Sequence, residues 1–307
     1  EIPQIAMAKT FQNGDFRSGY YRDQTFMMAI GQLTVQEFFA QLYATPDVNL
    51  EPASAGRSMN GHFATRSLDE NGNWKNLMQM KNSSADISPT GSQMQRLVGL
   101  AYASKLYRNN KDLHKYKEFT DKGNEVAFGT IGNASCAEGM FFESINAAGV
   151  LMVPMAISIW DDGYGISVPN SYQITKQNIS EILKGFEYDE VSKQGYYIFK
   201  CKGWDYEGLI KTYKEGIELV RKNHIPAIFH ITEVTQPQGH STSGSHERYK
   251  DKNRLQWEND FCCIKQMRYW ILEKGIASEK ELDKIEEDAK LFTKKSQEEA
   301  WKEYLEP

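Results

Sequence analysis

Three stretches of the chain are almost continuously apolar, and each is followed by polar residues. They run from Glu125 to Ile131, from Met152 to Trp160 and from Ala227 to Val234. Uninterrupted apolar runs of this length are typical of strands that are covered on both faces, as in a parallel sheet. Between the first two runs, apolar residues recur at helical spacing from Phe141 to Ala148. The pattern therefore predicts an α/β fold, with a mostly parallel sheet flanked by helices.

Amphipathic helices are predicted outside this unit. One long helix is expected from Thr25 to Tyr43, where apolar residues again follow helical spacing. Another is expected from Gln256 to Lys274. Ser278 and Glu281 form a capping box, which predicts that a final helix starts there and extends to Tyr304. We therefore expect a helical C-terminal region from about residue 256 to the end.

Composition narrows the class of protein. The 307 residues have a formal net charge of -5, and no basic stripe alternates with aromatic residues, so nothing supports nucleic-acid binding. We find no signal peptide and no apolar run of about 18 residues, so we expect no membrane association. The four cysteines lack metal-site spacing, and their small number together with the lack of a signal peptide favours a reducing cytoplasm. No repeat or Pro-, Gly- or Ser-rich linker divides residues 1–307, which we expect to form a single domain.

The polar residues that follow the first two apolar runs form the candidate site. Because neighbouring parallel strands end at the same edge of a sheet, these two turns should meet in one crevice. The helix that follows the first turn presents an N-terminus suited to phosphate. The pattern predicts a site for a metal-bound diphosphate. The two turns consist of Gly132, Asn133, Ala134 and Ser135, and of Asp161, Asp162, Gly163 and Tyr164.

This arrangement resembles the thiamin diphosphate fingerprint, in which Gly-Asp-Gly is followed at a similar spacing by Asn-Asn. Here 26 residues, Ser135 to Trp160, separate the two turns. The continuation GYGISVP is similar to one branch of that family, the alpha subunit of the decarboxylating dehydrogenase component of 2-oxo acid dehydrogenase complexes. The resemblance implies a thiamin diphosphate-binding fold. It also implies diphosphate contacts from Gly132, Asn133, Ala134, Ser135, Asp162 and Tyr164, and Mg²⁺ bound by Asn133, Asp162 and the carbonyl of Tyr164.

The match departs from the family at two of these metal positions. Asn133 stands where the family has Asp, and Asp162 stands where it has Asn. A hard cation accepts a carboxylate or an amide oxygen, so the exchange preserves the charge of the ligands if both residues bind. Asp161 adds a second acid, which would repel the diphosphate unless it points away. A non-catalytic homologue with an altered metal motif remains an alternative.

Two further segments resemble the same alpha subunits. Gly19 to Asp23 resembles a Tyr-Arg-Asp motif, which implies that Tyr21 and Arg22 contact the diphosphate. A guanidinium suits that role because its planar fork binds phosphate oxygens in pairs. Later in the chain, Ile87-Ser88-Pro89-Thr90 resembles a loop that contacts the aminopyrimidine. The resemblance implies cofactor contacts from Ser88 and Thr90, and K⁺ binding as in some members.

A fourth segment, Gln236 to Ser243, resembles the Arg-x-x-Gly-His-Ser loop of these subunits, with Gln236 in place of the Arg. The resemblance implies that His240 binds the cofactor and is the catalytic residue that helps to pass the acyl group to a lipoyl arm. Histidine suits proton transfer near neutral pH. An isolated histidine in a polar loop is often only solvated, but this loop follows the strand predicted from Ala227 to Val234, which should end beside the cofactor.

The resemblance implies oxidative decarboxylation of a 2-oxo acid with acyl transfer to a lipoyl group. In the family, the glutamate that activates the cofactor belongs to a beta subunit, so this chain supplies only the diphosphate and magnesium half of the site. It implies a beta subunit or fused beta-like domain, a lipoyl acyltransferase, and a heterotetramer or a dimer of fused chains. An acetoin-type dehydrogenase is an alternative. The Gly-His-Ser-Thr-Ser segment favours the branched-chain over the pyruvate type, but the sequence does not fix the 2-oxo acid.

Overall fold

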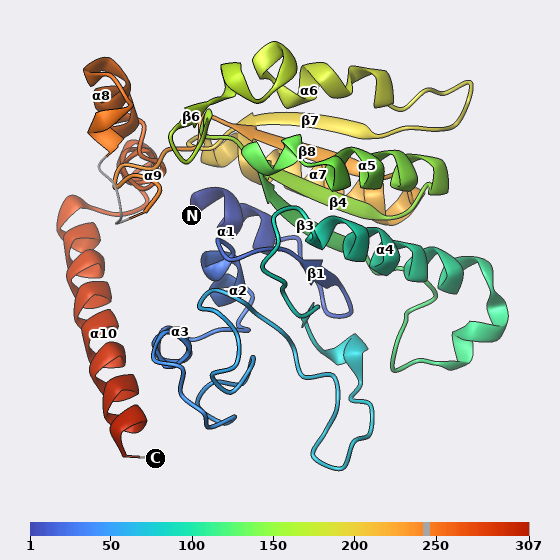
Figure 1. Ribbon diagram of the computed structural model, residues 1–307, viewed down its shortest axis with the longest axis horizontal. Coiled ribbons are helices and arrows are strands. Elements are labelled where there is room, and N and C mark those ends of the chain that lie inside the picture. Colours follow the sequence, from blue (N-terminus) through green and yellow to red (C-terminus); the bar gives the residue numbers. More distant parts are fainter. Residues whose placement is uncertain (242–245, 307) are drawn as a thin grey trace.

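A single parallel sheet forms the centre of the computed structural model, which describes residues 1–241 and 246–306 (Figure 1). Its strand order is β2-β1-β3-β4-β8-β7, and every neighbouring pair is parallel. This confirms the predicted α/β fold. A two-stranded antiparallel ribbon of β5 (Tyr164–Gly165) and β6 (Val168–Pro169) follows β4. The six strands are β1 (Phe16–Ser18), β2 (Asn82–Ser83), β3 (Ala127–Gly132), β4 (Met155–Trp160), β7 (Tyr197–Lys202) and β8 (Ala227–Thr232).

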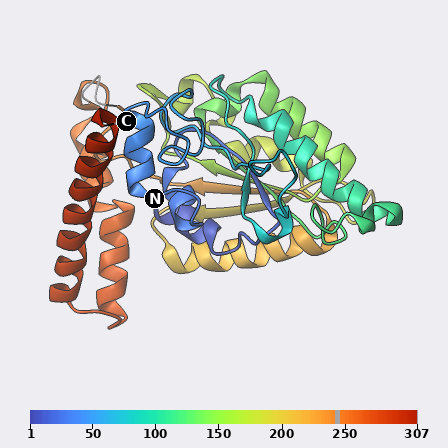
Figure 2. The same ribbon diagram turned by 90° about the horizontal axis from the view of Figure 1, so that it is seen from below.

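Helices cover both faces of the sheet. Figure 2 shows the yellow-orange α7 on one side and the teal and green α4 and α5 on the other. On the first side lie α1 (Ile2–Ala8), α2 (Gln24–Ala29) and α7 (Tyr206–Asn223). On the second lie α4 (Gln93–Asn109), α5 (Gly139–Leu151) and α6 (Ile179–Ile182). Short 3-10 segments are η1 (Leu77–Gln79), η2 (Lys111–Lys115), η3 (Ala134–Ala137), η4 (Asn170–Tyr172), η5 (Thr175–Gln177), η6 (Leu183–Phe186) and η7 (His246–Arg248).

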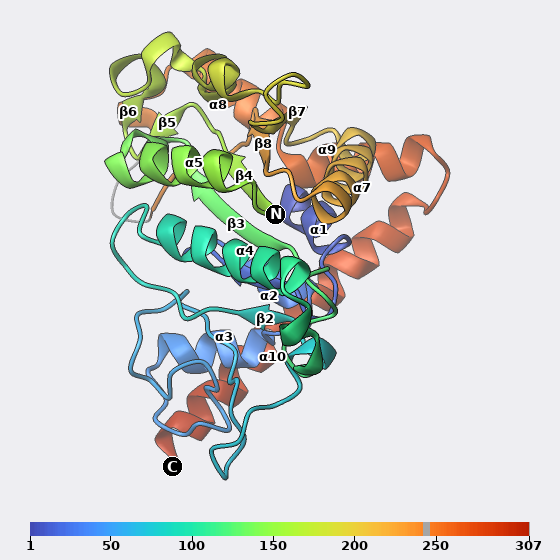
Figure 3. The same cartoon turned by 90° about the vertical axis from the view of Figure 1, so that its right-hand side faces the viewer.

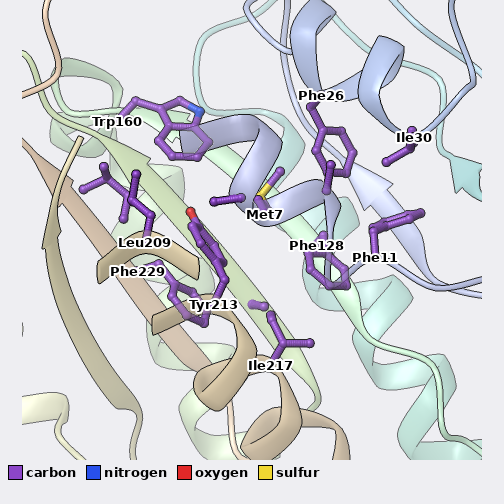
Figure 4. Packing of buried hydrophobic residues seen from close by; sticks show 14 of the residues in the cluster. Met7, Phe11, Phe26, Ile30, Phe128, Trp160, Leu209, Tyr213, Ile217 and Phe229 are labelled. Atoms are coloured by element: carbon purple, nitrogen blue, oxygen red, sulfur yellow. The ribbon is translucent and has the colours of Figure 1, made fainter. Parts of the chain in front are cut away.

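Two hydrophobic clusters, one on each face, explain why the strands are apolar without alternation. Successive residues of β4 point to opposite faces, so Ile157 and Ile159 pack under α4 and α5. Ala156 and Trp160 join the cluster on the other face. That cluster contains stacked rings of Tyr213 and Phe229, whose centroids are 4.7 Å apart (Figure 4). Burial on both faces therefore favours apolar residues at most strand positions, with hydrogen-bonded polar exceptions such as Ser158 on β4 and His230 on β8.

Two helices predicted as continuous are each broken, so those two predictions were wrong. The first is α2 followed by α3 (Val35–Leu42), because Gly31 has a φ of 75° and Thr34 begins α3 with a capping box. The second is α8 (Lys252–Asp260) followed by α9 (Cys263–Glu273), with Cys262 as the N-cap of α9. In both places the apolar spacing continues across the break, so periodicity alone did not reveal it.

The final helix, α10 (Glu279–Leu305), begins with the predicted capping box of Ser278 and Glu281. It runs back along the molecule and packs against α3 (Figure 3). The ring of Tyr43 lies 5.1 Å from that of Trp301, and Gln36 donates a 2.7 Å hydrogen bond to Glu303. Among the described residues, no helix is both long and apolar enough to cross a bilayer.

Candidate cofactor site

The two predicted turns leave the sheet side by side. Strands β3 and β4 are paired through their last residues, Gly132 opposite Trp160. The next backbone N–H, that of Asn133, donates to the Trp160 carbonyl at 3.0 Å. Asp161 in turn donates its N–H to the carbonyl of Ile231, at the end of β8. Polar residues from three neighbouring strands are therefore held at one edge of the sheet, where open α/β sheets bind ligands.

Asn133 links the first turn to the second. Its side chain is buried, and its Nδ2 donates to the Tyr164 carbonyl at 3.1 Å and to Oδ1 of Asn170 at 2.7 Å. Ala134 and Ser135 follow in η3, and α5 begins at Gly139. Two of the three predicted metal ligands, Asn133 and Tyr164, are thus in direct contact.

Asp162, the third predicted ligand, caps its own turn. Its Oδ1 accepts the N–H of Tyr164 at 3.0 Å. Burial raises the pKa of its carboxyl to about 6, against the opposing effects of the Tyr164 hydrogen bond and nearby cations. Those cations are Lys250 and Arg254, which both lie over the Tyr164 ring, at 5.1 and 5.2 Å from its centroid. Glu258 pairs with both of them, so their charge is partly balanced.

The oxygen donors of this loop fit a magnesium ion in chemical type. A carboxylate, an amide oxygen and a backbone carbonyl are the hard ligands that Mg²⁺ prefers. The nitrogen of the Asn133 amide is engaged, whereas its oxygen accepts no hydrogen bond from any described residue. Among the described residues there is no group of three or more His, Cys, Asp or Glu that could hold a metal. A cation here would have to use the mixed oxygen donors of the loop.

Arg22 and His240 lie together, although 218 residues separate them. The guanidinium is 2.9 Å from Nδ1 of His240 and donates to the His240 carbonyl at 3.1 Å. It also lies over the ring of Tyr21, 5.1 Å from the centroid. Burial, together with the charges of Arg22 and Lys250, lowers the pKa of His240 below its ordinary value. The structure therefore brings together the predicted residues Tyr21, Arg22 and His240.

Two further donors near this edge fit an anionic group. Burial raises the pKa of Tyr20 well above its ordinary value, so its phenol keeps its proton. A Cβ placed on Gly132 would lie 3.7 Å from that hydroxyl, which locates it at the end of β3. The indole N–H of Trp160 is buried at the end of β4 and has no hydrogen-bond partner in the described part of the chain. These donors add to the Arg22 guanidinium and suit the oxygens of a diphosphate.

A buried ion network holds the segment that carries Arg22. Arg17, at the centre of β1, has no exposed surface and pairs with Asp23 at 2.7 Å and Asp86 at 3.0 Å. It also donates to the Tyr20 carbonyl at 3.1 Å. Asp23 accepts from the Thr130 hydroxyl on β3 as well. The backbone on both sides of Tyr21 and Arg22 is therefore fixed to the sheet.

Comparison with known proteins identifies the family. The family model described as "Dehydrogenase E1 component" matches residues 1–306. The chain belongs to this family. This confirms the relationship expected from its motifs, and membership implies thiamin diphosphate as the cofactor.

Curated relatives of this E1 chain are alpha subunits. The 2-oxoisovalerate dehydrogenase subunit alpha of Bacillus subtilis (strain 168) is 25% identical over 266 residues, covering 86% of this chain and 68% of that protein. The pyruvate dehydrogenase E1 component subunit alpha of Rickettsia bellii (strain RML369-C) is 27% identical over 211 residues, covering 67% and 56%. The mitochondrial human 2-oxoisovalerate dehydrogenase subunit alpha is 24% identical over 277 residues, covering 90% and 53%. The matched region thus spans between half and about two thirds of these relatives.

In this E1 chain, Ser88 and Thr90 lie in the loop before α4, and both are exposed. The Ser88 hydroxyl is 3.0 Å from Nε2 of His62. A Cβ on Gly91 would lie 3.9 Å from the Ser135 carbonyl, so the loop runs beside η3. The loop is thus adjacent to the first turn, but Ser88 and Thr90 make no side-chain hydrogen bond to the other candidate residues among those described.

The extra acid, Asp161, is hydrogen-bonded through both of its oxygens to protein donors in this E1 chain. Its Oδ2 lies 2.9 Å from Nε2 of His230, a fully buried histidine on β8. Burial acts to raise the pKa of Asp161, but the hydrogen bond and charge of His230, together with the hydrogen bonds from Gly163 and Asn170, outweigh it, so the pKa lies below its ordinary value. Motif matching did not single out His230, Tyr20, Lys250 or Arg254. The only signal for His230 was a histidine inside an apolar run.

Proposed function

We propose that this chain supplies the diphosphate- and metal-binding part of a thiamin diphosphate-dependent 2-oxo acid dehydrogenase. The reaction is oxidative decarboxylation of a 2-oxo acid with transfer of the acyl group to a lipoyl group. The observation that carries the proposal is the pairing of Arg22 with His240 beside the turns that contain Asn133 and Asp162. A cation, a titratable imidazole and hard oxygen donors lie together at the carboxyl edge of a parallel sheet.

In this proposal, the diphosphate contacts come from the guanidinium of Arg22, from Tyr21 and from the first turn. The first turn contributes the backbone of Gly132, Asn133, Ala134 and Ser135. Asn133, Asp162 and the Tyr164 carbonyl hold Mg²⁺, which neutralises diphosphate charge. Ser88 and Thr90 contact the aminopyrimidine, and their loop is the candidate K⁺ site. The bound cofactor supplies the nucleophilic carbon that makes loss of carbon dioxide from a 2-oxo acid possible.

His240 is the proposed catalytic residue of this chain. Its lowered pKa keeps the imidazole neutral near pH 7, and because Nδ1 faces the Arg22 guanidinium, the proton of the ring lies on Nε2, where it can hydrogen-bond the reacting group. Arg22 fixes its orientation through Nδ1 and through the backbone carbonyl. The imidazole can therefore hold or move a proton at Nε2 while the acyl group passes to its acceptor. This positioning matters because a proton is transferred only between groups that lie within hydrogen-bonding distance of each other.

The proposed partners are a beta subunit or fused beta-like domain and a lipoyl acyltransferase. The relatives named above are subunits, and the glutamate that activates the cofactor in this family lies in the beta part. Exposed apolar side chains on α10, such as Leu291 and Phe292, support an interface. The expected assembly is a heterotetramer or a dimer of fused chains, and residues 1–307 are proposed to act as one domain within it. We propose a cytoplasmic location, which four free cysteines support.

The proposed substrate is a branched-chain 2-oxo acid. Relatives from Bacillus subtilis and human are named for 2-oxoisovalerate, and one from Rickettsia bellii is named for pyruvate. The test is turnover by the assembled protein with thiamin diphosphate, Mg²⁺ and an artificial electron acceptor. We expect 2-oxoisovalerate to have a higher kcat/KM than pyruvate, and the isolated chain to be inactive. Cleavage of acetoin without turnover of either 2-oxo acid would move the protein to the acetoin type.

One observation favours a second candidate, a non-catalytic homologue. The Asn133 amide nitrogen, not its oxygen, faces the Tyr164 carbonyl. If the Asn133 oxygen and the Tyr164 carbonyl cannot bind one cation while this contact is kept, the chain would keep the fold without the cofactor. Calorimetry of the assembled protein with thiamin diphosphate and Mg²⁺ separates the two. Metal-dependent binding of the cofactor supports the enzyme, and absence of binding supports the non-catalytic homologue.

A further inference from the structure

A buried histidine that the proposed chemistry does not use is connected to the metal loop. His230 lies on β8 with no exposed surface. Its Nδ1 is 3.0 Å from the hydroxyl of Ser180 on α6, and its Nε2 is 2.9 Å from Oδ2 of Asp161. Strand register sets this contact, because His230 is paired with Ile159, two residues before Asp161.

Both oxygens of the Asp161 carboxylate are occupied by donors from the protein itself. Oδ2 contacts His230, and Oδ1 accepts the Gly163 N–H at 2.9 Å and Nδ2 of Asn170 at 3.1 Å. A carboxylate can only accept hydrogen bonds, so each partner must present a donor. The amide of Asn170 is therefore oriented with its nitrogen toward Asp161 and its oxygen away from it.

The orientation of Asn170 determines that of Asn133. Oδ1 of Asn170 lies 2.7 Å from the Asn133 side chain, which must present its nitrogen because an amide oxygen cannot donate. The second hydrogen of that nitrogen is directed to the Tyr164 carbonyl at 3.1 Å. Both hydrogens of the Asn133 amide are used, and its oxygen is the one atom of the group left for a cation.

Neither reversed arrangement satisfies these buried groups. If the Asn133 amide alone were turned over, two amide oxygens would face each other at 2.7 Å. If Asn170 were turned as well, its oxygen would face the Asp161 carboxylate at 3.1 Å. Each arrangement sets two acceptors against each other in a buried site, where an unpaired polar group is most costly. The orientation of the Asn133 amide is therefore fixed by the contacts that begin at His230 and run through Asp161 and Asn170.

We propose that His230 is a positioning residue of the metal site. By holding the Asp161 carboxylate it fixes Asn170, and through Asn170 it turns the oxygen of Asn133 to the cation that accompanies the diphosphate. The four residues His230, Asp161, Asn170 and Asn133 form one positioning network. This inference rests on the proposed function, since it requires a cation bound by Asn133, Asp162 and Tyr164. Partners that orient metal ligands influence metal affinity without touching the ion.

The test compares two substitutions of His230 in the assembled protein. His230→Leu removes both ring nitrogens, whereas His230→Gln keeps an amide N–H that can reach Asp161. The readout is the affinity for Mn²⁺, used in place of Mg²⁺ with thiamin diphosphate and followed by electron paramagnetic resonance. We expect His230→Leu to weaken Mn²⁺ binding about 10- to 100-fold and His230→Gln about threefold or less, as for other partners of metal ligands.

A matched control separates positioning from general stability. Tyr213→Phe removes a buried 2.8 Å hydrogen bond to Ser158, on the opposite face of β4, and leaves the positioning network intact. It should lower the thermal midpoint but leave Mn²⁺ affinity unchanged. If His230→Leu fails to fold, the nearly isosteric Asp161→Asn replaces it. An amide at 161 can donate as well as accept, so Asn170 loses its fixed orientation and Mn²⁺ binding should weaken similarly.

Three results would overturn the inference. The first is wild-type Mn²⁺ affinity in His230→Leu or, where that variant does not fold, in Asp161→Asn. The second is a loss of affinity in His230→Leu matched by an equal loss in Tyr213→Phe, which would reduce His230 to a structural role. The third is wild-type protein that binds no Mn²⁺ in the presence of thiamin diphosphate. That third result removes the proposed function as well, whereas the first two leave it standing.

Discussion

The guanidinium of Arg22 lies 2.9 Å from Nδ1 of His240. A guanidinium has only donors, so Nδ1 must carry the lone pair that accepts this hydrogen bond. The proton of a neutral imidazole is then on Nε2. The same guanidinium holds the His240 carbonyl at 3.1 Å and lies farther, at 3.4 Å, from Nε2, so it fixes the backbone of the residue and favours this tautomer. An arginine expected to bind phosphate therefore also prepares the histidine expected to move a proton.

The first prediction concerns the pKa of His240. Burial and the charge of Arg22 lower it, so Arg22→Gln should raise it toward its ordinary value. The measurement is an NMR titration of the His240 ring in protein without cofactor, since the substitution also removes a diphosphate contact. Arg268→Gln, on α9 and paired with Asp283 and Glu286, is the matched control and should leave the titration unchanged. An unaltered His240 pKa in Arg22→Gln would contradict the assigned contact.

The second prediction separates the two steps of the proposed reaction. His240→Ala should reduce acyl transfer to a lipoyl acceptor about 100-fold, the usual contribution of a positioned proton donor or acceptor. Decarboxylation measured with an artificial electron acceptor should fall much less. Equal losses in both assays would mean that His240 mainly holds the diphosphate. Full activity in both assays would mean that His240 is only a solvated residue of its loop.

The strands could be predicted because burial on two faces leaves a continuous apolar signal. The runs ending at Ile131, Trp160 and Val234 became β3, β4 and β8 with changes of a few residues. Helix breaks could not be predicted in the same way. A helix and a helix–turn–helix can share one apolar spacing, and only local signals such as Gly31 and Thr34 distinguish them.

Some contacts of the site could likewise be predicted from the sequence, and others could not. Asn133 and Tyr164 were expected to meet, because each follows one of two neighbouring parallel strands, and they do. The contact between Asp161 and His230 joins residues 69 positions apart and depends on the register of β4 against β8. Lys250 reaches the Tyr164 ring from beyond the His240 loop. Contacts set by register and by loop paths carry no periodic signal in the sequence.

The third prediction concerns the two exchanged metal positions. Asp162→Ala should weaken Mg²⁺-dependent binding of thiamin diphosphate about tenfold more than Asn133→Ala, because it removes the one negative charge among the proposed ligands. Titration calorimetry of the assembled protein measures both. The thermal midpoint of each variant is needed as well, since Asn133→Ala also breaks contacts to Tyr164 and Asn170. A larger effect of Asn133→Ala at an unchanged midpoint would count against the assignment.

The fourth prediction concerns the support beneath Arg22. Arg17→Met leaves the buried carboxylates of Asp23 and Asp86 without their cation. We expect a loss of about 3–5 kcal/mol in the free energy of unfolding, as for other buried pairs that lose one partner. Arg17→Lys keeps the charge but not the planar guanidinium that pairs with both carboxylates, so its loss in the free energy of unfolding should be smaller. Urea denaturation compares the two, and a loss below about 1 kcal/mol in Arg17→Met would show that the network is not stabilising.

The fifth prediction is a pH dependence of stability that comes from His224. This residue ends α7 with a φ of 53°, and its Nε2 lies 2.8 Å from the Gly123 carbonyl. Burial lowers its pKa to about 4, and the charge of Arg108 acts in the same direction. The unfolded chain therefore binds a proton at a higher pH than the folded one, so stability is complete above about pH 6.5 and is lost as the pH falls toward 4. Because nearby solvent screens part of the effect, we expect a loss of about 1–2 kcal/mol in the free energy of unfolding between about pH 8 and 5.

The control for this prediction is His224→Asn, which tolerates the left-handed backbone but cannot titrate. The difference in unfolding free energy between the two proteins should therefore shift by that amount over this range. A difference that stays constant with pH would show that His224 is protonated equally in both states.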